Sequence, residues 1–318
     1  MRELRSALVL GGAGFLGRWV LGALLEIGTR VVSLDRDPRG RLLDLDVESV
    51  QGDVASGDRL LPDLVAERTF DLVVQAVGTG SVPRSLEHPL GDLSSNAGTT
   101  LAILETLAAL DPPPLLVLVS SAAVYGDSVR LPIDEDHPLE PVSPYGVSKL
   151  AAEQYVRLYA RLHGLPALSV RPFSLYGPGQ RKLVVHDLLS RLEAGEDPLV
   201  VRGRPDVTRD FVFVQDAARG VVTLGRRAPA AGEPYNLSSG RGTSLGELTA
   251  ALARATGRQV EVQFTGDARA GDPLRWEGDQ RRSAALGARC DMPLAEGLRR
   301  TVAWFRETAR DRPRPSSG

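Results

Sequence analysis

The feature that most constrains this chain is a glycine-rich turn between its first predicted strand and its first predicted helix. The segment Gly-Gly-Ala-Gly-Phe-Leu-Gly occupies residues 11–17 and places glycines at positions 11, 14 and 17. Glycine is needed where the backbone turns tightly and approaches a pyrophosphate, and the start of the next helix offers N–H groups and partial positive charge to phosphates. The segment therefore predicts a dinucleotide-binding α/β unit.

An acidic residue follows at the spacing that such a unit requires. Asp35 ends the second predicted strand, where its carboxylate can accept hydrogen bonds from a ribose diol. A carboxylate there repels a 2′-phosphate, so Asp35 favours NAD over NADP, although the neighbouring Arg36 weakens that preference. Asp53 follows the third predicted strand and is expected to meet the adenine edge. The alternative is that the glycines serve only turns and that Asp35 is a solvated loop residue.

Short apolar runs alternate with longer amphipathic stretches in the first half of the chain. The predicted strands are 6–10, 30–34, 49–52, 70–76, 115–120 and 167–171. The predicted helices are 14–27, 59–67, 95–110 and 144–163. Ser143 is expected to cap the last of these, with Pro144 in its first turn. The alternation predicts an α/β fold with a Rossmann-type doubly wound parallel sheet, covered by helices on both faces.

The alternation of predicted strands and helices becomes less regular after about residue 177. Predicted helices at 183–194, 216–226, 244–256 and 294–310 surround predicted strands at 210–214 and 259–264. We expect residues 1–176 to form an NAD-binding domain, with a return segment near 210–240. Residues 177–209 and 241–311 are then a smaller, mixed C-terminal substrate lobe, and residues 312–318 a disordered tail.

Composition excludes several classes of function. The net charge of −2 over 318 residues does not indicate a basic surface for nucleic-acid binding. The single cysteine, Cys290, excludes an intramolecular disulfide framework. The four histidines are scattered without metal-ligand spacing, and no apolar run is long enough to cross a membrane. The glycine-rich turn comes so early that no signal peptide is expected. We therefore expect a cytoplasmic globular enzyme with no metal, no nucleic-acid partner and no membrane contact.

A candidate catalytic group lies in the first turns of the helix predicted at 144–163. Tyr145 and Lys149 are four residues apart and so share one helix face. An ammonium beside a phenol favours the phenolate, which would let Tyr145 act as a general base. Ser120 and Ser121 close the strand predicted at 115–120, at the sheet edge where ligands bind. The alternatives are a surface Tyr/Lys pair and a serine that only satisfies a backbone group.

Together these motifs carry a family resemblance over residues 5 to about 308. The chain resembles the extended short-chain dehydrogenase/reductases, in particular the NAD-dependent nucleotide-sugar epimerase/dehydratase family and its 4-epimerases. The matching segments, in family order, are Gly11–Gly17, Asp35, Gly52–Asp53, Asn96–Thr99, Ser120–Gly126, Ser143–Lys149, Arg171–Gly179, Arg209–Asp216 and Arg269–Asp272.

The resemblance implies roles for individual residues. Ser121, Tyr145 and Lys149 would be the catalytic triad, with Tyr145 as acid/base, Lys149 on the nicotinamide ribose and Ser121 on the reacting oxygen. The expected NAD contacts are Gly11, Gly14, Phe15, Leu16, Gly17, Asp35, Arg36, Asp53, Val54, Gln75, Ala76, Val77, Asn96, Ser120, Tyr145, Lys149 and Pro172. The expected contacts of a nucleotide-diphosphate sugar are Ser81, Arg84, Ser121, Ala122, Tyr145, Ser174, Arg209 and Arg269.

Three of these residues match more specific family positions. Asn96 matches a position that supports the active-site helix. Arg209 and Arg269 match positions that bind the diphosphate, for which a guanidinium fork is well suited. The alternative for either arginine is a surface salt bridge, such as one between Arg209 and Asp210.

The residues after Ser121 indicate which reaction of the family to expect. Family members that eliminate water, or that decarboxylate, carry acidic residues where this chain has Ala122 and Ala123. A methyl group cannot transfer a proton, so the resemblance favours 4-epimerisation: transient oxidation at C4 to a 4-keto sugar, followed by hydride return to the opposite face. The alternatives are a 4-ketosugar reductase or an atypical dehydratase of the family, and, more remotely, a non-catalytic dinucleotide sensor.

The identity of the sugar stays open. Ser174 stands where the family often has asparagine, and Gln75 opens a segment that departs from the usual form. The segment Gly80–Ser85 resembles epimerases of N-acetylhexosamines and uronic acids, whereas the bulky Trp276 would crowd an N-acetyl group.

The family often dimerises through two helices of each subunit. Here these would be the helices predicted at 95–110 and 144–163, and we expect a homodimer. Four leucines fit either this seam or packing on the sheet: Leu101, Leu104, Leu107 and Leu158.

Overall fold

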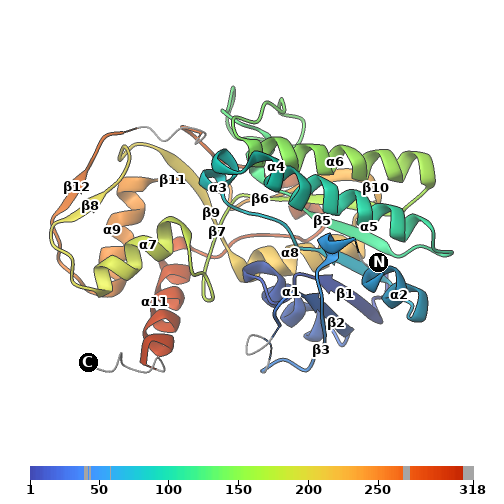
Figure 1. The fold of residues 1–318 in the computed structure, drawn as a ribbon. Coiled ribbons are helices and arrows are strands. Elements are labelled where there is room, and N and C mark those ends of the chain that lie inside the picture. The colour runs from blue at the N-terminus through green and yellow to red at the C-terminus, as the bar shows by residue number, and fades with distance from the viewer. Residues whose placement is uncertain (39–41, 43, 58, 268–272, 311–318) are drawn as a thin grey trace.

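A parallel sheet of seven strands forms the centre of the molecule (Figure 1). The computed structural model describes residues 1–38, 42, 44–57, 59–267 and 273–310. The strands are β1 (Ser6–Leu10), β2 (Arg30–Asp35), β3 (Glu48–Gln51), β4 (Leu72–Gln75), β5 (Leu115–Val119), β6 (Ala167–Pro172) and β10 (Ala231–Leu237). Their order across the sheet is β10-β6-β5-β4-β1-β2-β3. The predicted doubly wound sheet is confirmed.

The strands bury both of their faces because successive side chains point to opposite sides. Ala7 and Val9 of β1 pack in one apolar cluster with helices α1 (Phe15–Leu25) and α8 (Val214–Arg227). Leu8 and Leu10 pack in the other, with helices α2 (Leu60–Glu67), α5 (Thr99–Ala108) and α6 (Pro144–His163). The near-continuous apolar strand sequences follow from this double burial.

The helix predicted at 95–110 differs from the observed one. Helical structure starts earlier, at α3 (Val82–Glu87) and α4 (Pro89–Leu93), each with a proline in its first turn. A π-helical turn, Ser94–Gly98, then joins α4 to α5. Single π-turns inside helices occur often at functional sites.

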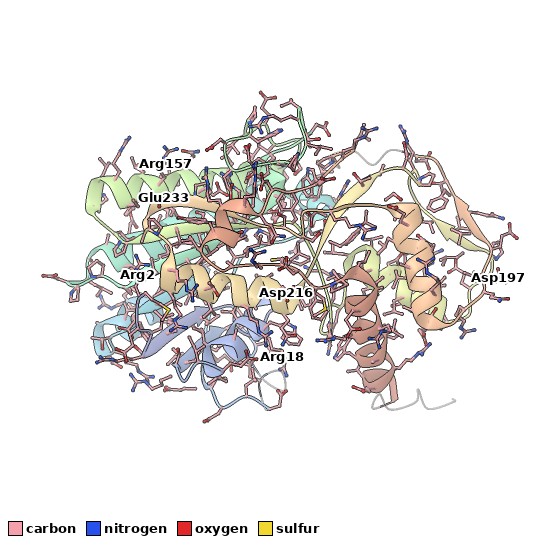
Figure 2. All side chains as sticks on the ribbon, turned by 180° about the vertical axis from the view of Figure 1, so that it is seen from behind. Arg2, Arg18, Arg157, Asp197, Asp216 and Glu233 are labelled. Carbon is pink, nitrogen blue, oxygen red and sulfur yellow. The ribbon has the colours of Figure 1, made fainter. Side chains whose placement is uncertain are left out.

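The chain returns to the central sheet after an excursion into the C-terminal lobe. β10 pairs in parallel with β6 at the sheet edge, and Pro234 is tolerated there because an edge strand needs fewer donors. The glycine and the proline in β10 are unfavourable in strands, so this strand was not predicted from the sequence. At the other end of this return segment lies Asp216 of α8, which is labelled in Figure 2. Its carboxylate accepts a hydrogen bond of 2.8 Å from the backbone N–H of Met292.

The C-terminal lobe has a core of its own, built from short strands and helices. A three-stranded sheet contains β7 (Ser174–Tyr176), β9 (Thr208–Phe213) and β11 (Gly242–Ser244), and β8 (Leu199–Val201) pairs with β12 (Val262–Phe264). Its helices are α7 (Leu183–Glu193), α9 (Leu245–Thr256), α10 (Arg281–Ala285) and α11 (Leu294–Arg310). The strands of three residues are too short for a periodic sequence signal. Among the described residues, no helix combines the length and apolarity that a membrane crossing needs.

Candidate active site

A cavity of about 820 Å³ opens where β1, β2 and β4 end. The C-terminal lobe contributes to it through Gly179–Leu183 of the α7 approach and through Trp304 and Thr308 of α11. The predicted site residues that line the cavity are Gly11, Gly14, Phe15, Asp35, Arg36, Asp53, Val54, Ala76, Val77 and Arg84. The tertiary structure thus gathers residues of four separate predicted motifs around one space.

The glycine-rich turn fits a pyrophosphate. A Cβ atom on Gly17 would stand 2.1 Å from the carbonyl oxygen of Gly11, so only glycine lets α1 pack this closely on the turn. Within the described residues, no side chain caps the N-terminus of α1 at Gly14, which leaves its first N–H groups available to an anion.

Asp35 lies on the wall of the same cavity, beside the glycine-rich turn. Its Oδ2 accepts a hydrogen bond of 3.1 Å from the backbone N–H of Ala13, and its Oδ1 accepts one of 3.2 Å from Asp37. The carboxylate is half-buried on the cavity wall rather than solvated in a loop. These residues fit NAD, for which Asp35 would hold the adenosine ribose.

Eight of the predicted cofactor residues are not among those that line the cavity: Tyr145 and Lys149, described below, and six others. Leu16 is buried in the core against the sheet, and Pro172 ends β6. Gln75 donates a hydrogen bond of 2.8 Å to Thr100, and the buried Ser120 hydroxyl has no partner among the described groups. Gly17 contacts the turn itself, and Asn96 is engaged within the protein, as described below.

Helix α6 carries the candidate catalytic pair, and its start is fixed locally. The Ser143 hydroxyl accepts a hydrogen bond of 3.2 Å from the Gly146 N–H, and Pro144 occupies the first turn, as predicted. Ser121 caps the short 3₁₀ turn Ala122–Val124 by accepting a hydrogen bond of 3.1 Å from Ala123 N–H. The side chain of Ser121 lies beside the Tyr145 phenol and lowers the pKa of that phenol.

The charge state of Tyr145 differs from the sequence expectation. We expected the Lys149 ammonium to lower the pKa of Tyr145, but burial of the phenol is the largest effect and raises that pKa. Ser121 opposes the rise, and the Asp92 carboxylate adds to it. The ammonium of Lys149 instead donates a hydrogen bond of 3.0 Å to the carbonyl oxygen of Val119. In the protein without cofactor, burial therefore keeps the Tyr145 phenol mainly protonated.

The pKa of Lys149 lies closer to the neutral pH range than that of an ordinary lysine. Burial lowers the pKa of Lys149 from 10.5 to about 8, although Asp92 and Glu153 both favour the ammonium. Only two of the 38 basic residues in the chain are lysines, Lys149 and Lys182, and Lys182 lines the cavity. An arginine cannot lose its proton near neutral pH, so position 149 is one where lysine and arginine are not interchangeable.

The family model for the NAD dependent epimerase/dehydratase family matches residues 7–238. The chain belongs to this family. Its NAD dependence and its epimerase/dehydratase fold are therefore properties of this chain as well.

Individual relatives of this epimerase/dehydratase-family chain are similar over nearly their whole length. A UDP-glucose 4-epimerase of Mycolicibacterium smegmatis is 33% identical over 311 residues, which cover 94% of this chain and 98% of the relative. The crystal structure of UDP-glucose 4-epimerase from Thermotoga maritima with UDP-glucose superposes with a TM-score of 0.88 at 27% identity, covering 96% of this chain and 99% of the other. The Thermus thermophilus UDP-glucose 4-epimerase complex with NAD gives a TM-score of 0.85 at 30% identity, covering 95% and 99%.

The predicted substrate residues of this family member lie on several separate elements. Ser81 caps α3 and accepts a hydrogen bond of 3.4 Å from Arg84 N–H, Ala122 is fully buried, and Ser174 lies in β7. The Arg209 guanidinium lies 5.4 Å from the centre of the Trp276 ring. Arg269 lies outside the described residues, as does the predicted tail 312–318.

Asp210 and Trp276, near Arg209, are both engaged in the protein interior. The buried Asp210 accepts hydrogen bonds from the backbone of Ser239 and Gly278. Trp276 is buried against Phe173, with ring centres 5.9 Å apart, and donates a hydrogen bond of 3.0 Å to the Gly126 carbonyl.

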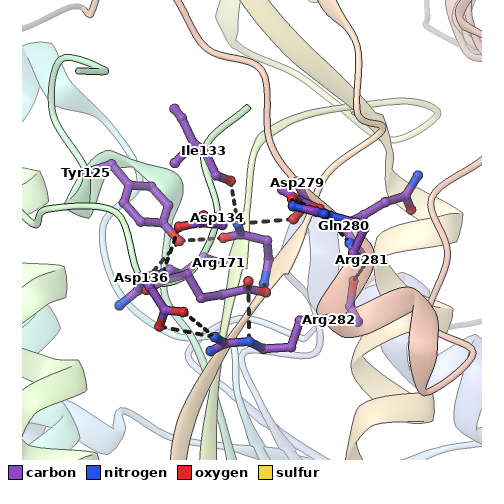
Figure 3. Close-up of polar contacts among 12 residues, drawn as sticks. Tyr125, Ile133, Asp134, Asp136, Arg171, Asp279, Gln280, Arg281 and Arg282 are labelled. Atoms are coloured by element: carbon purple, nitrogen blue, oxygen red, sulfur yellow. Dashed lines mark hydrogen bonds and ion pairs between the residues drawn. The ribbon is translucent and has the colours of Figure 1, made fainter. Parts of the chain in front are cut away.

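A polar cluster around Tyr125 and Arg171 lies in the protein interior after β5 (Figure 3). The Tyr125 hydroxyl donates to Asn236 Oδ1 at 2.7 Å and accepts from Arg171 at 2.9 Å. Arg171 also donates to both carboxylate oxygens of Glu153, which lies one turn beyond Lys149 on α6. The cluster thus ties the strand end after β5, the catalytic helix and the edge strand β10 together. Sequence reasoning missed it because its members are brought together only by the sheet.

A second polar group, largely buried, contacts the first turns of α6 and was also missed, apart from Asn96. It consists of Thr79, Asp92, Asn96 and Ser148. Gly78, with a φ of 129°, precedes it, and a Cβ atom there would stand 2.4 Å from Asn96 Oδ1. The supporting role that the resemblance implied for Asn96 agrees with these contacts. Only the glycine and the asparagine carried a signal in the sequence.

Proposed function

We propose that this chain is a nucleotide-sugar 4-epimerase that uses tightly held NAD, with UDP-glucose and UDP-galactose as its substrate pair. Relatives named UDP-glucose 4-epimerase support the nucleotide and the sugar. The single observation that carries the reaction type is the pair Ala122 and Ala123 beside Ser121. Both are buried methyl groups, so neither offers the carboxyl group that elimination of water from the sugar needs.

In this proposal the protein residues handle the proton and hold the sugar. Tyr145 acts in its phenolate form, the minor form in the protein without cofactor. The phenolate oxygen accepts the proton of the 4-hydroxyl, and the Ser121 hydroxyl donates a hydrogen bond to the same sugar oxygen. When bound, NAD supplies an acceptor for the C4 hydrogen as hydride and later returns it. Tyr145 then gives its proton back to the oxygen at C4 after the sugar has turned over. Lys149 binds the nicotinamide ribose and keeps a positive charge near the phenol.

The two lobes divide these tasks. We infer that residues 1–176, with the return segment near 210–240, hold NAD, and that residues 177–209 and 241–311 hold the nucleotide sugar. The guanidinium of Arg209, steadied by Trp276, is suited to the diphosphate. We further place this activity in the cytoplasm.

We also propose that the protein is a homodimer. Leu104 and Leu107 of the predicted seam are fully buried inside the subunit, so they pack on the sheet instead. Nearby apolar side chains remain exposed and suit a second copy: Leu86, Leu90, Leu93, Val147, Tyr155 and Leu162. Light scattering coupled to gel filtration tests this directly. A monomeric mass for the native protein would contradict it.

The function is tested by incubating the purified protein with UDP-galactose, without added cofactor, and identifying products by NMR. We expect UDP-glucose to form at equilibrium with the substrate, because the cofactor is regenerated in each cycle. Oxidation of UDP-galactose to a 4-keto sugar only with stoichiometric added NAD, with NADH released as the second product, would indicate a ketosugar reductase running in reverse. Loss of the 6-hydroxyl from the product would indicate a dehydratase. No conversion of any UDP-, dTDP-, GDP- or ADP-hexose would contradict the proposal and favour a non-catalytic sensor.

A further inference from the structure

Four polar side chains form a closed hydrogen-bonded ring beneath the first turns of α6. Asn96 Nδ2 donates to the hydroxyls of Thr79 and Ser148, at 3.0 Å each. Both hydroxyls in turn donate to Asp92: Ser148 to Oδ2 at 2.6 Å, and Thr79 to Oδ1. Asp92 is 3% exposed, Asn96 1% and Ser148 2%, so water competes little for the contacts among these three, whereas Thr79 is half-buried on the cavity wall.

The ring requires an acceptor at position 92. The Thr79 backbone N–H donates to Asn96 Oδ1 at 3.1 Å, which fixes the orientation of the Asn96 amide. Both amide hydrogens of Asn96 therefore point at the two hydroxyls, which must then donate their own hydrogens onward. Two converging donors need a group with two acceptor oxygens and no hydrogen, and an ionised carboxylate is such a group.

The ring also connects the cavity to the catalytic helix. Thr79 lines the cavity, whereas Ser148 lies on α6 between Tyr145 and Lys149. Ser148 Oγ lies 3.0 Å from the backbone carbonyl oxygen of Tyr145, so the ring contacts the turn that carries the phenol. A shift of the Asp92 side chain would therefore also move the turn of α6 that carries Tyr145.

The charge of Asp92 reaches both titrating side chains of the candidate site. Asp92 raises the pKa of Lys149 and the pKa of Tyr145. The other charged group that acts on Lys149 is Glu153, whose carboxylate is paired with Arg171. For Tyr145 the other group is the neutral hydroxyl of Ser121. Asp92 is thus the carboxylate common to both.

We propose that Asp92 is a positioning residue for the epimerase reaction, which holds the Tyr145 turn of α6 through Ser148 and places a carboxylate beside the turn that carries Tyr145 and Lys149. The inference rests on the proposed function only for its kinetic consequence. Its electrostatic part concerns the protein alone and can be tested without substrate.

The chain is well suited to that test because it has only two lysines. Protein labelled with ¹³C at lysine Cε gives two side-chain NMR signals, and K182R assigns the signal of Lys149. In the native protein we expect Lys149 to titrate near pH 8. In D92N, removal of the carboxylate should lower that midpoint by roughly one pH unit. D92N keeps one acceptor oxygen for Thr79 but opens the ring at Ser148, which is then able to donate to the Tyr145 carbonyl instead.

Two further variants complete the experiment. D63N makes the same change at an exposed carboxylate on α2, paired there with Arg59, and should leave the Lys149 midpoint and turnover unchanged. S148A keeps the charge but removes the link, so kcat should fall about tenfold or more while KM and the Lys149 midpoint stay near their native values.

The outcomes separate the inference from the proposed function. In D92N the pH–rate profile should also move to lower pH, a displacement that simple loss of folded protein does not produce. An unchanged Lys149 midpoint in D92N overturns the electrostatic role, and native turnover in S148A overturns the positioning role. If D92N does not fold, the S148A kinetics decide the inference. If the native protein converts no nucleotide sugar, the proposed function fails while the lysine titration still decides the role of Asp92.

Discussion

The ammonium of Lys149 donates a hydrogen bond of 3.0 Å to the carbonyl oxygen of Val119, the last residue of β5. This contact joins the catalytic helix to the strand end from which Ser120 and Ser121 follow. It fixes Lys149 at the edge of the sheet, where the glycine-rich turn also lies. The side chain is buried there, and its charge is correspondingly costly.

Replacement of the acid/base group should stop turnover without removing the cofactor. In Y145F the proton acceptor is lost, and we expect kcat to fall by about 10²–10⁴. S121A, which removes only the hydrogen bond to the sugar oxygen, should reduce kcat less. NAD content, measured after release by acid, should match that of the native protein in both variants. Near-native turnover in Y145F would contradict the assignment.

Arginine should not substitute for Lys149. The guanidinium is larger, stays charged and cannot repeat the single contact with Val119, so we expect K149R to lower kcat by about 10² or more. The reverse exchange R161K, at an exposed position near the end of the same helix, serves as the control and should leave kcat unchanged. Steady-state assays of both variants decide the prediction, and equal activities would argue against it.

Gly17 should not tolerate substitution by alanine, whereas Gly22 of the same helix should tolerate it. In G17A the new Cβ meets the backbone of Gly11, and we expect unfolding to become easier by about 1–3 kcal/mol, with loss of NAD binding. In G22A the new Cβ meets no atom within 4 Å, so the helix should gain about 0.5–1 kcal/mol. Urea unfolding and calorimetric titration with NAD measure both effects. Similar behaviour of the two variants would refute the close approach.

Removal of one partner from the buried ion pair should be costly. Arg171 and Glu153 are 3% and 6% exposed, so R171M leaves an uncompensated buried carboxylate and should cost about 3–5 kcal/mol of unfolding free energy. R68M breaks a pair with Glu48 in which both side chains are substantially exposed, and should cost about 1 kcal/mol or less. Denaturant titrations of both variants test the contrast. A small loss in R171M would show that Glu153 finds another partner or a proton.

Lys149 should make stability depend on pH in the alkaline range. The folded protein has a Lys149 pKa of about 8, below the ordinary value of 10.5, so between these values the unfolded chain binds more protons. Stability from this group therefore rises as the pH increases from about 8 to 10.5. The difference in unfolding free energy between native protein and K149M, measured at several pH values, isolates this effect. The unfolding free energy of the native protein minus that of K149M should increase over that range, and a value that stays constant or decreases would contradict the assignment.

Local sequence determined much of this protein. The glycine-rich turn, the strand that precedes it, the Ser143 cap and the Tyr145 and Lys149 spacing are all set by neighbours within a few residues. Such features rest on backbone freedom, capping hydrogen bonds and helix periodicity, which a short stretch of chain already specifies. The parallel sheet followed from the alternation of strands and helices for the same reason.

Only the tertiary structure decided the surroundings of these groups. The ring of Thr79, Asp92, Asn96 and Ser148, and the return of β10 beside β6, join segments that lie far apart in the sequence. Burial also reversed the expected effect on Tyr145, because the cost of desolvating a phenol depends on everything packed around it. Chain order fixed which side chains were available, whereas long-range packing fixed which of them meet and in what charge state.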